Sequence, residues 1–259
     1  MVMISLSLTS CSRQQQVVLI VAGSTSVQPY AEILAEEFAH LHPELLVDVQ
    51  GGGSSAGVTA VNSGTADIGM SSRALKSSEE NLWSIEIAKD GLAIIVNPRN
   101  PVLNLSLEQV KAVYSGEFKN WSLLGGVDHP IHVITREEGS GTRSAFEELV
   151  MGSAFVTPKA LVQDSNGVVR QLVAGDPYAV GYISLGLVDQ TVKALELDGV
   201  AAIVENVLLG SYHLYRPFLF VSLSEPEGPA RLYIDYILSP EGQKLLEDEG
   251  LIPRWEEVR

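Results

Sequence analysis

Hydrophobic positions along this chain fall into short apolar runs that alternate with segments of helical spacing. After the run at 17–22, the positions Tyr30, Leu34 and Phe38 recur at the four-residue spacing of a helix. Strands are predicted at 17–22, 45–50, 66–70, 92–97, 131–136, 179–184, 200–204 and 214–223. Helices are predicted after residue 27 and at 58–62, 105–114, 143–151, 167–174, 229–238 and 240–249. Strands that alternate with helices predict an α/β fold with largely parallel sheets.

Glycine and small hydroxyl residues fill several junctions between a strand and the next helix. These junctions read Gly-Ser-Thr-Ser at 23–26, Gly-Ser-Ser-Ala-Gly at 53–57, Asp-Ile-Gly-Met-Ser-Ser at 67–72 and Arg-Glu-Glu-Gly-Ser-Gly-Thr at 136–142. The N–H groups of a first helical turn are unpaired, and the helix dipole there favours negative charge. Because ligands of open α/β sheets bind beyond the carboxyl ends of strands, the junctions predict one converging site.

Arg136 gives the predicted site its chemistry. A guanidinium carries a planar fork of donors that matches an oxyanion through two hydrogen bonds. The small residues that follow it open the helix predicted at 143–151. A simpler interpretation is that Ser140 or Thr142 only caps this helix while Arg136 lies on the surface. Recurrence of the same kind of junction upstream favours a small-anion site.

The ordered series of four motifs resembles the ligand loops of the phosphate-binding proteins of bacterial ABC importers. The resemblance runs from about Val18 to the C-terminal helix, and residues 90–97 are similar to the family's first crossover between lobes. It implies a two-lobed periplasmic-binding-protein fold, type II-like, with two mixed sheets, helices on both faces and a hinge of two crossover strands. It also implies boundaries, with lobe I at 17–95 and 213–259 and lobe II at 96–212.

The resemblance further implies an extracytoplasmic protein that captures inorganic phosphate between its lobes and delivers it to an ABC permease in the membrane. We expect a monomer that is not an enzyme and that needs no cofactor or metal. The ligand-binding residues that follow from the matched motifs are Ser24, Thr25, Ser26, Ser54, Ser72, Arg136, Ser140, Gly141 and Thr142. Ser55 and Arg73 are expected behind them, and Glu138 is expected to orient Arg136.

Ser72 departs from the family pattern, because many relatives carry a carboxylate at this position. That carboxylate accepts the proton of hydrogen phosphate and repels sulfate, which has no proton to give. A serine is more permissive, since its hydroxyl both donates and accepts hydrogen bonds. A binding protein for sulfate, molybdate or tungstate is therefore an alternative that stays open.

Residues 53–57 also fit the Gly-x-Ser-x-Gly pattern of a serine hydrolase, with Ser55 as the nucleophile. Such an enzyme needs a later histidine, and only His213 stands late in the chain. A hydrolase would leave Arg136 without a role, so this alternative ranks below binding. Other histidines, such as His129 and His132, lack the spacing or the carboxylate neighbours of a metal site.

Charge and composition narrow the class of partner. The formal net charge of −15 argues against nucleic acid, which needs a basic surface. Charge over the whole protein is screened within about 8–10 Å, so local donors can still bind an anion. No apolar run in the 259 residues is long enough to cross a bilayer.

Cys11 is the only cysteine, so no internal disulfide can form. Its context, Leu-Thr-Ser-Cys at 8–11, resembles the lipobox where a bacterial lipoprotein is cleaved and lipidated. Residues 1–10 lack Lys and Arg and are short for a signal peptide. We expect residues 1–16 to be a signal and lipobox remnant with a polar tether. The protein would then lie in the periplasm or on the outer face of the cell membrane, anchored through Cys11.

Overall fold

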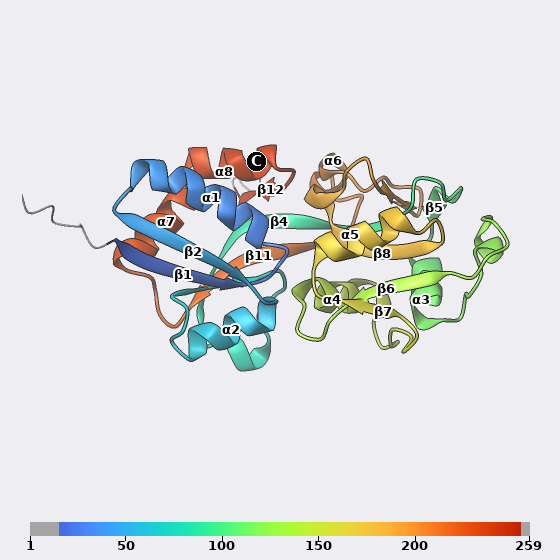
Figure 1. Ribbon diagram of the computed structural model, residues 1–259, viewed down its shortest axis with the longest axis horizontal. Coiled ribbons are helices and arrows are strands. Elements are labelled where there is room, and N and C mark those ends of the chain that lie inside the picture. Colours follow the sequence, from blue (N-terminus) through green and yellow to red (C-terminus); the bar gives the residue numbers. More distant parts are fainter. Residues whose placement is uncertain (1–15, 255–259) are drawn as a thin grey trace, which may run out of the picture.

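The computed structural model describes residues 16–254, which form two lobes joined by two long strands (Figure 1). Each lobe has its own hydrophobic core. The core of the first lobe includes Val21, Leu34, Phe38, Ile68 and Phe220, and that of the second includes Ile94, Trp121, Phe146, Val169 and Tyr182. Separate cores are what two bodies that rotate about a hinge require.

The first lobe contains a sheet whose first three strands are parallel, with helices on both faces. β1 (Val17–Gly23) lies between β2 (Leu45–Gly51) and β3 (Ile68–Ser71) and pairs in parallel with both. α1 (Gln28–Leu41) follows β1, and α2 (Ser54–Asn62) follows β2. The two helices lie on opposite sides of the sheet (Figure 1). Their first turns therefore start from the same sheet edge, where β1 and β2 end.

Two strands run between the lobes. β4 (Trp83–Val96) pairs antiparallel with β11 (Tyr215–Ser222) up to Gly91 and with β8 (Ala179–Ser184) from Leu92 onward. Hydrogen bonding passes through β4 from one mixed sheet to the other, in the strand order β2-β1-β3-β11-β4-β8-β6-β7. A backbone that belongs to both sheets suits a hinge, because small torsional changes in it rotate one lobe against the other.

The second lobe is built around β8. β6 (His132–Arg136) pairs in parallel with β8 and with β7 (Leu161–Gln163). The helices are α3 (Leu107–Ser115), α4 (Gly141–Phe146), α5 (Asn166–Gly175) and α6 (Val204–Leu208), and a π-helical turn (Glu147–Met151) continues α4. Short strands β9 (Lys193–Ala194), β5 (Asn104–Leu105) and β10 (Glu196–Leu197) complete it, with β9 on β4 and the other two paired together.

After β11 the chain forms helices of the first lobe again. These are α7 (Gly228–Ile237) and α8 (Pro240–Asp248), followed by β12 (Ile252–Pro253), which pairs antiparallel with β4. Short 3-10 turns lie at Ser77–Glu79, Trp121–Leu124 and Leu185–Leu187. None of the helices between residues 16 and 254 combines the length and the apolar character needed to span a membrane.

The predicted two-lobed α/β fold, with mixed sheets and two crossover strands, is confirmed. The strand predicted at 200–204 is wrong. Leu197 and Val200 form an isolated bridge around a turn in which Asp198 has a φ of 51°, and α6 begins at Val204. A short apolar run does not tell a strand from a buried helical turn by its periodicity. The lobe boundaries stay a prediction, and Cys11 lies outside the described residues.

Candidate functional site

The turn after β1 is shaped by Gly23, whose φ is 140°. A side chain here would collide with the backbone of Met70, so only glycine lets β1 and β3 end side by side. The next residue joins the same strand, since the N–H of Ser24 donates to the carbonyl of Met70 at 2.9 Å. The hydroxyl of Ser24 accepts from the N–H of Ser26 at 3.2 Å. This bond fixes the turn that carries Thr25 and Ser26 toward the second lobe.

Three hydroxyl groups from three strand ends form one buried cluster. Ser24 follows β1, Ser54 begins α2 after β2, and Ser72 follows β3. The hydroxyl of Ser24 donates to that of Ser72 at 2.9 Å, and the oxygens of Ser54 and Ser72 lie 3.3 Å apart. The N–H of Ser72 donates to the Ser54 hydroxyl at 3.0 Å. Three hydroxyl groups, each able to donate or to accept a hydrogen bond, thus lie at one point of the cleft.

The second lobe supplies the other wall through the turn between β6 and α4. Ser140 is the N-cap of α4, and its hydroxyl accepts from the N–H of Arg143 at 3.3 Å. The simpler interpretation of Ser140 as a cap is therefore correct, but it does not place Arg136 on the surface. A Cβ atom on Gly141 would overlap the hydroxyl oxygens of Ser54 and Ser72. Gly141 therefore lets the two lobes approach closely.

Direct hydrogen bonds cross between the lobes at this site. The hydroxyl oxygens of Ser26 and Thr142 lie 2.7 Å apart. Arg136 donates through Nη2 to the hydroxyl of Thr25 at 3.0 Å. All nine predicted binding residues thus meet in one place, between the first turns of α1 and α2 and the β6–α4 turn. Their assignment to a ligand stays a prediction, because proximity does not name a ligand.

Arg136 is buried, with 1% of its surface exposed. Its Nε donates to Glu137 Oε2 at 2.9 Å and its Nη2 to Glu137 Oε1 at 3.0 Å. The expectation that Glu138 orients Arg136 is therefore wrong. Glu137 takes this role because it directly follows the arginine at the strand end and reaches both nitrogens of one edge. A bidentate pair of this kind fixes the plane of the guanidinium.

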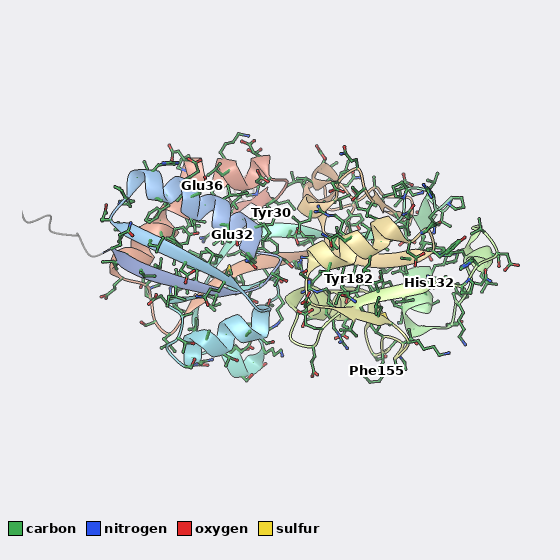
Figure 2. All side chains as sticks on the ribbon, in the orientation of Figure 1. Tyr30, Glu32, Glu36, His132, Phe155 and Tyr182 are labelled. Carbon is green, nitrogen blue, oxygen red and sulfur yellow. The ribbon has the colours of Figure 1, made fainter. Side chains whose placement is uncertain are left out.

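Tyr182 holds the backbone of Arg136 in place through a hydrogen bond. Its phenol oxygen accepts from the N–H of Arg136 at 3.2 Å and lies 2.8 Å from the hydroxyl of Thr135. Burial raises the pKa of Tyr182 to about 12, so the phenol stays neutral at ordinary pH. Figure 2 places Tyr182 in the part of the second lobe that faces the first, opposite Tyr30 of α1.

Asn166 is a site residue that sequence reasoning missed. It begins α5, directly after the N-cap Ser165, and is 1% exposed. Its Nδ2 donates to the hydroxyl of Ser26 at 2.8 Å, and its Oδ1 accepts from Nη1 of Arg136 at 3.3 Å. One side chain thus joins the first lobe to the guanidinium. The signal was a Ser-Asn-Gly junction before the helix predicted at 167–174, the same composition as the junctions that were recognised.

The buried arginines of the described residues each have a carboxylate partner. The pairs are Arg73 with Glu79 at 2.7 Å, Arg136 with Glu137 at 2.9 Å, and Arg216 with Asp90 at 2.9 Å. The hydrogen bonds from Arg73 hold the pKa of Glu79 below its usual range, against the opposing effect of burial. The formal charge of each of these arginines is therefore balanced by a carboxylate of the protein. An anion in the cleft would be held by hydroxyl and N–H donors and by the outer edge of a paired guanidinium.

Metal binding has no support in the part of the chain that the structure describes. Among residues 16–254, no three His, Cys, Asp or Glu side chains are grouped closely enough to hold a metal ion. The chemistry available at the site is the donation of hydrogen bonds from fixed directions. A ligand with several acceptor oxygens fits such donors best.

Sequence and structure comparisons agree with one another. Residues 11–241 match the family described as the PBP superfamily domain. The phosphate-binding protein PstS of Bacillus subtilis is 33% identical over 241 residues, which cover 91% of this chain and 80% of the relative.

Two solved structures are more similar still. One is a phosphate ABC transporter substrate-binding protein with bound phosphate from Clostridium perfringens, with a TM-score of 0.88, 43% identity, and coverage of 91% of this chain and 99% of that one. The other is an ABC-type phosphate transport receptor from Vibrio cholerae, with a TM-score of 0.76, 41% identity, and the same coverage of both chains. The chain therefore belongs to the PBP superfamily and, within it, to the family of the PstS phosphate-binding proteins.

Proposed function

We propose that this protein captures inorganic phosphate in the cleft between its lobes and delivers it to an ABC importer. The observation that carries the proposal is the convergence of the Ser24, Ser54 and Ser72 hydroxyls with Arg136 and Thr142 across the two lobes. The family of the chain and the phosphate bound to its Clostridium perfringens relative support this ligand.

Tetrahedral oxyanions suit a site with donors on both walls. The first turn of α2 begins at Ser54, a residue of the serine cluster, and a helix N-terminus favours negative charge. The first turn of α1 adds no free N–H group, because Pro29 has none and those of Gln28, Tyr30 and Ala31 donate to backbone carbonyls. Arg136, Ser140 and Thr142 act from the other lobe, with Gly141 allowing the approach. Hydroxyl–hydroxyl contacts within the site can be exchanged for contacts to ligand oxygens. Closing the lobes around the ligand removes it from water, which strengthens each hydrogen bond.

Ser72 leaves the choice between phosphate and other oxyanions open in this proposal. Its hydroxyl donates to a bare oxygen or accepts from a protonated one, so Ser72 itself does not exclude sulfate. Sulfate, molybdate and tungstate therefore stay as alternative ligands for the same site. The nearby Glu137 has both carboxylate oxygens bonded to Arg136, which makes it a poor acceptor for the proton of the ligand.

The hydrolase alternative is disfavoured by the surroundings of Ser55. The hydrogen bond described for the Ser55 hydroxyl comes from Nη2 of Arg73 at 3.5 Å. An arginine is always protonated and does not serve as the base that a serine nucleophile needs. His213 lines a different pocket, at the side of β4 and β11. We propose a binding protein without catalytic activity.

Location and partners complete the proposal. Relatives named as transport receptors and substrate-binding proteins of ABC transporters support an extracytoplasmic site of action and permease subunits as partners. We further propose that Cys11 carries a lipid anchor and that the protein acts as a monomer. Cys11→Ala should release the protein from the membrane fraction or leave an unprocessed precursor. A native protein recovered in soluble form with residues 1–10 attached would contradict the anchor.

Isothermal titration of the purified protein tests the ligand. Phosphate, sulfate, molybdate and tungstate are titrated separately at neutral pH, after bound anion has been removed by dialysis. The proposal predicts that phosphate binds most tightly with one site per chain. Tighter binding of another oxyanion would reassign the ligand. A fluorophosphonate probe is expected to leave Ser55 unlabelled, and labelling abolished by Ser55→Ala would support the hydrolase instead.

A further inference from the structure

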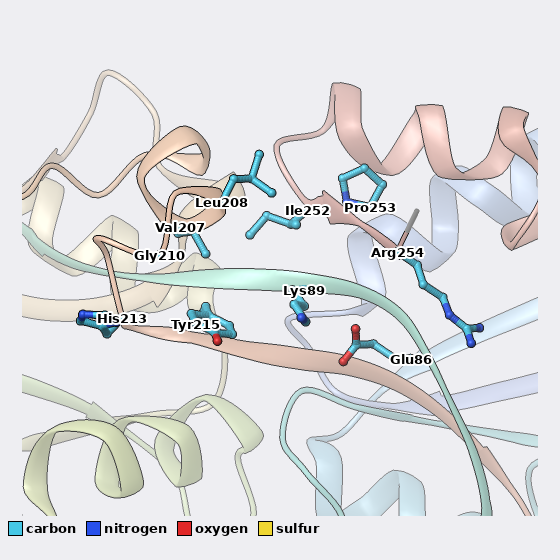
Figure 3. Close-up of a pocket in the computed structure, with 10 residues that line it drawn as sticks. All are labelled: Glu86, Lys89, Val207, Leu208, Gly210, His213, Tyr215, Ile252, Pro253 and Arg254. Carbon is cyan, nitrogen blue, oxygen red and sulfur yellow. The ribbon is translucent and has the colours of Figure 1, made fainter. Parts of the chain in front are cut away.

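A pocket lies beside the two crossover strands (Figure 3). No residue of the serine cluster lines it. Its volume is ≈ 360 Å³. One wall comes from the second lobe, and the other from the C-terminal end of the first lobe. The residues that line it are Glu86, Lys89, Val207, Leu208, Gly210, His213, Tyr215, Ile252, Pro253 and Arg254. Nothing in the proposed ligand site uses these side chains.

The crossover strands separate this pocket from the ligand cleft. Successive residues of a strand point to opposite faces, so Lys89 and Asp90 of β4 face opposite ways, as do Tyr215 and Arg216 of β11. Lys89 and Tyr215 line the pocket, with the Lys89 ammonium 5.8 Å from the centre of the Tyr215 ring. Asp90 and Arg216 pair on the other face.

That other face looks toward the ligand site. The hydroxyl of Ser184 donates to Asp90 Oδ1 at 2.6 Å and lies 3.4 Å from the phenol oxygen of Tyr30, in the first turn of α1. The positive charge of Arg136 also contributes to lowering the pKa of Arg216, after the larger effect of burial. The buried pair therefore lies between the hinge strands and the ligand turns. The pocket is on the reverse side of the same hinge.

The two walls of the pocket belong to different lobes. Val207 and Leu208 belong to α6, in the second lobe. Ile252 and Pro253 form β12, which is paired to the first-lobe part of β4 at Lys89 and Ala88. Ile252 is nevertheless part of the hydrophobic core of the second lobe, with only 5% of its surface exposed. An apolar contact between the lobes therefore already exists behind the hinge.

The ligand cleft and this pocket lie on opposite sides of the hinge, so a rotation that widens one narrows the other. Opening the ligand cleft rotates the lobes about β4 and β11, and this moves the α6 wall toward the β12 wall. We propose that the pocket behind the hinge limits how far the cleft opens, so that added bulk in it favours the closed form. This inference rests on the proposed function, because the phosphate Kd is used to measure how far the equilibrium favours the closed form. Apparent affinity follows the fraction of molecules that are already closed.

Leu208→Trp tests the inference, with Leu209→Trp as the matched control. Leu208 lines the pocket and is 45% exposed, so a larger side chain can be accommodated without disturbing a core. Leu209 is the next residue, is 79% exposed and does not line the pocket. We expect Leu208→Trp to lower the phosphate Kd by about threefold or more, and Leu209→Trp to leave it unchanged. Leu208→Ala enlarges the pocket and is expected to raise the Kd.

Small-angle X-ray scattering without phosphate gives a second readout that does not depend on the ligand. Leu208→Trp is expected to have a smaller radius of gyration than the native protein and Leu209→Trp. Equal Kd values and equal radii for both tryptophan variants would overturn the inference, as would weaker binding by Leu208→Trp. A native protein that fails to bind phosphate would instead defeat the proposed function, and the scattering comparison would still decide the role of the pocket.

Discussion

The hydroxyl oxygens of Ser26 and Thr142 lie 2.7 Å apart, although one residue belongs to the first lobe and the other to the second. A contact of this length forms only when the two walls of the cleft have closed on each other. Binding therefore has two requirements. Hydrogen-bond donors must contact the ligand, and the two walls of the cleft must be able to approach each other closely. Variants can be chosen that test each condition separately.

Gly141→Ala tests the fit of the walls. The added Cβ atom would overlap the hydroxyl oxygens of Ser54 and Ser72, so the α4 turn would stand away from the first lobe. We predict phosphate binding weaker by roughly tenfold or more, which corresponds to about 1.4 kcal/mol. The melting temperature without phosphate should change little, because the open form relieves the clash. Titration calorimetry and a thermal melt measure the two quantities.

Gly167→Ala is the control for this variant. Gly167 also lies in the first turn of a second-lobe helix, but a Cβ atom there would have its nearest neighbour, Ser165 Oγ, at 4.0 Å. Its phosphate affinity should equal that of the native protein. If Gly141→Ala also binds with native affinity, the close approach of the α4 turn is not needed for binding.

Asn166→Ala removes a side chain that joins Ser26 to Arg136. Leaving buried donors or acceptors unsatisfied costs about 1–3 kcal/mol, so we predict a loss of phosphate affinity of roughly tenfold. The exchange Asn206→Ala removes a second-lobe amide that bonds to the carbonyl of Ala201 and should leave the affinity unchanged. Equal affinities for the two variants would show that Asn166 has no part in binding.

Ser72→Asp tests how the site tells phosphate from sulfate. A carboxylate at this position would accept the proton of hydrogen phosphate and would leave sulfate facing an unpaired charge, at a cost of about 1–3 kcal/mol or more. We predict that the ratio of sulfate Kd to phosphate Kd rises by roughly tenfold or more in Ser72→Asp. Competition titrations at neutral pH measure this ratio. Very strong rejection of sulfate by both proteins would move the discrimination to another residue.

The ion pair of Arg73 and Glu79 is expected to contribute folding stability that is lost in acid. Hydrogen bonds from Arg73 lower the pKa of Glu79 from the ordinary value of 4.5, while burial opposes this. A lowered folded pKa contributes stability above pH 4.5 that is lost as the pH falls below it. We predict that the melting temperature of Glu79→Gln falls less between pH 5 and pH 3 than that of the native protein. Glu80→Gln, with the same change of charge at an exposed neighbour, should follow the native curve.

Sequence predicted those parts of the fold and site that depend on local chemistry. The stripe of Tyr30, Leu34 and Phe38 is buried as its helical spacing requires. The junctions at 23–26 and 53–57 meet in space because the parallel strands β1 and β2 end at a common sheet edge. The junction at 136–142 meets them from the second lobe, across the cleft, and small residues are required where the backbones approach closely. Gly23 and Gly141 show this requirement directly, since a side chain at either position would collide with another strand or turn.

The features of the site that the sequence did not predict depend on contacts between residues far apart in the chain. Asp90 and Arg216 pair across 126 positions, and the crossover motif that begins at Asp90 does not indicate this partner. Asn166 reaches Ser26 across 140 positions, so only the packed lobes show that it belongs to the site. The choice of Glu137 over Glu138 depends on which side chain the β6–α4 turn directs at Arg136. The sequence pattern does not distinguish Glu137 from Glu138, because both are glutamates next to each other in the same turn.

Arg136→Ala tests the central claim most directly, because Arg136 is the buried cation that contacts both lobes. Truncating one partner of a buried, hydrogen-bonded charge pair costs about 2–5 kcal/mol. Titration of phosphate into the folded variant is therefore predicted to show affinity weaker by roughly 30-fold or more. Arg231→Ala removes the same charge from an exposed pair with Asp235 and should bind as the native protein does. Native affinity in a folded Arg136→Ala protein would contradict the assignment of this cleft as the phosphate site.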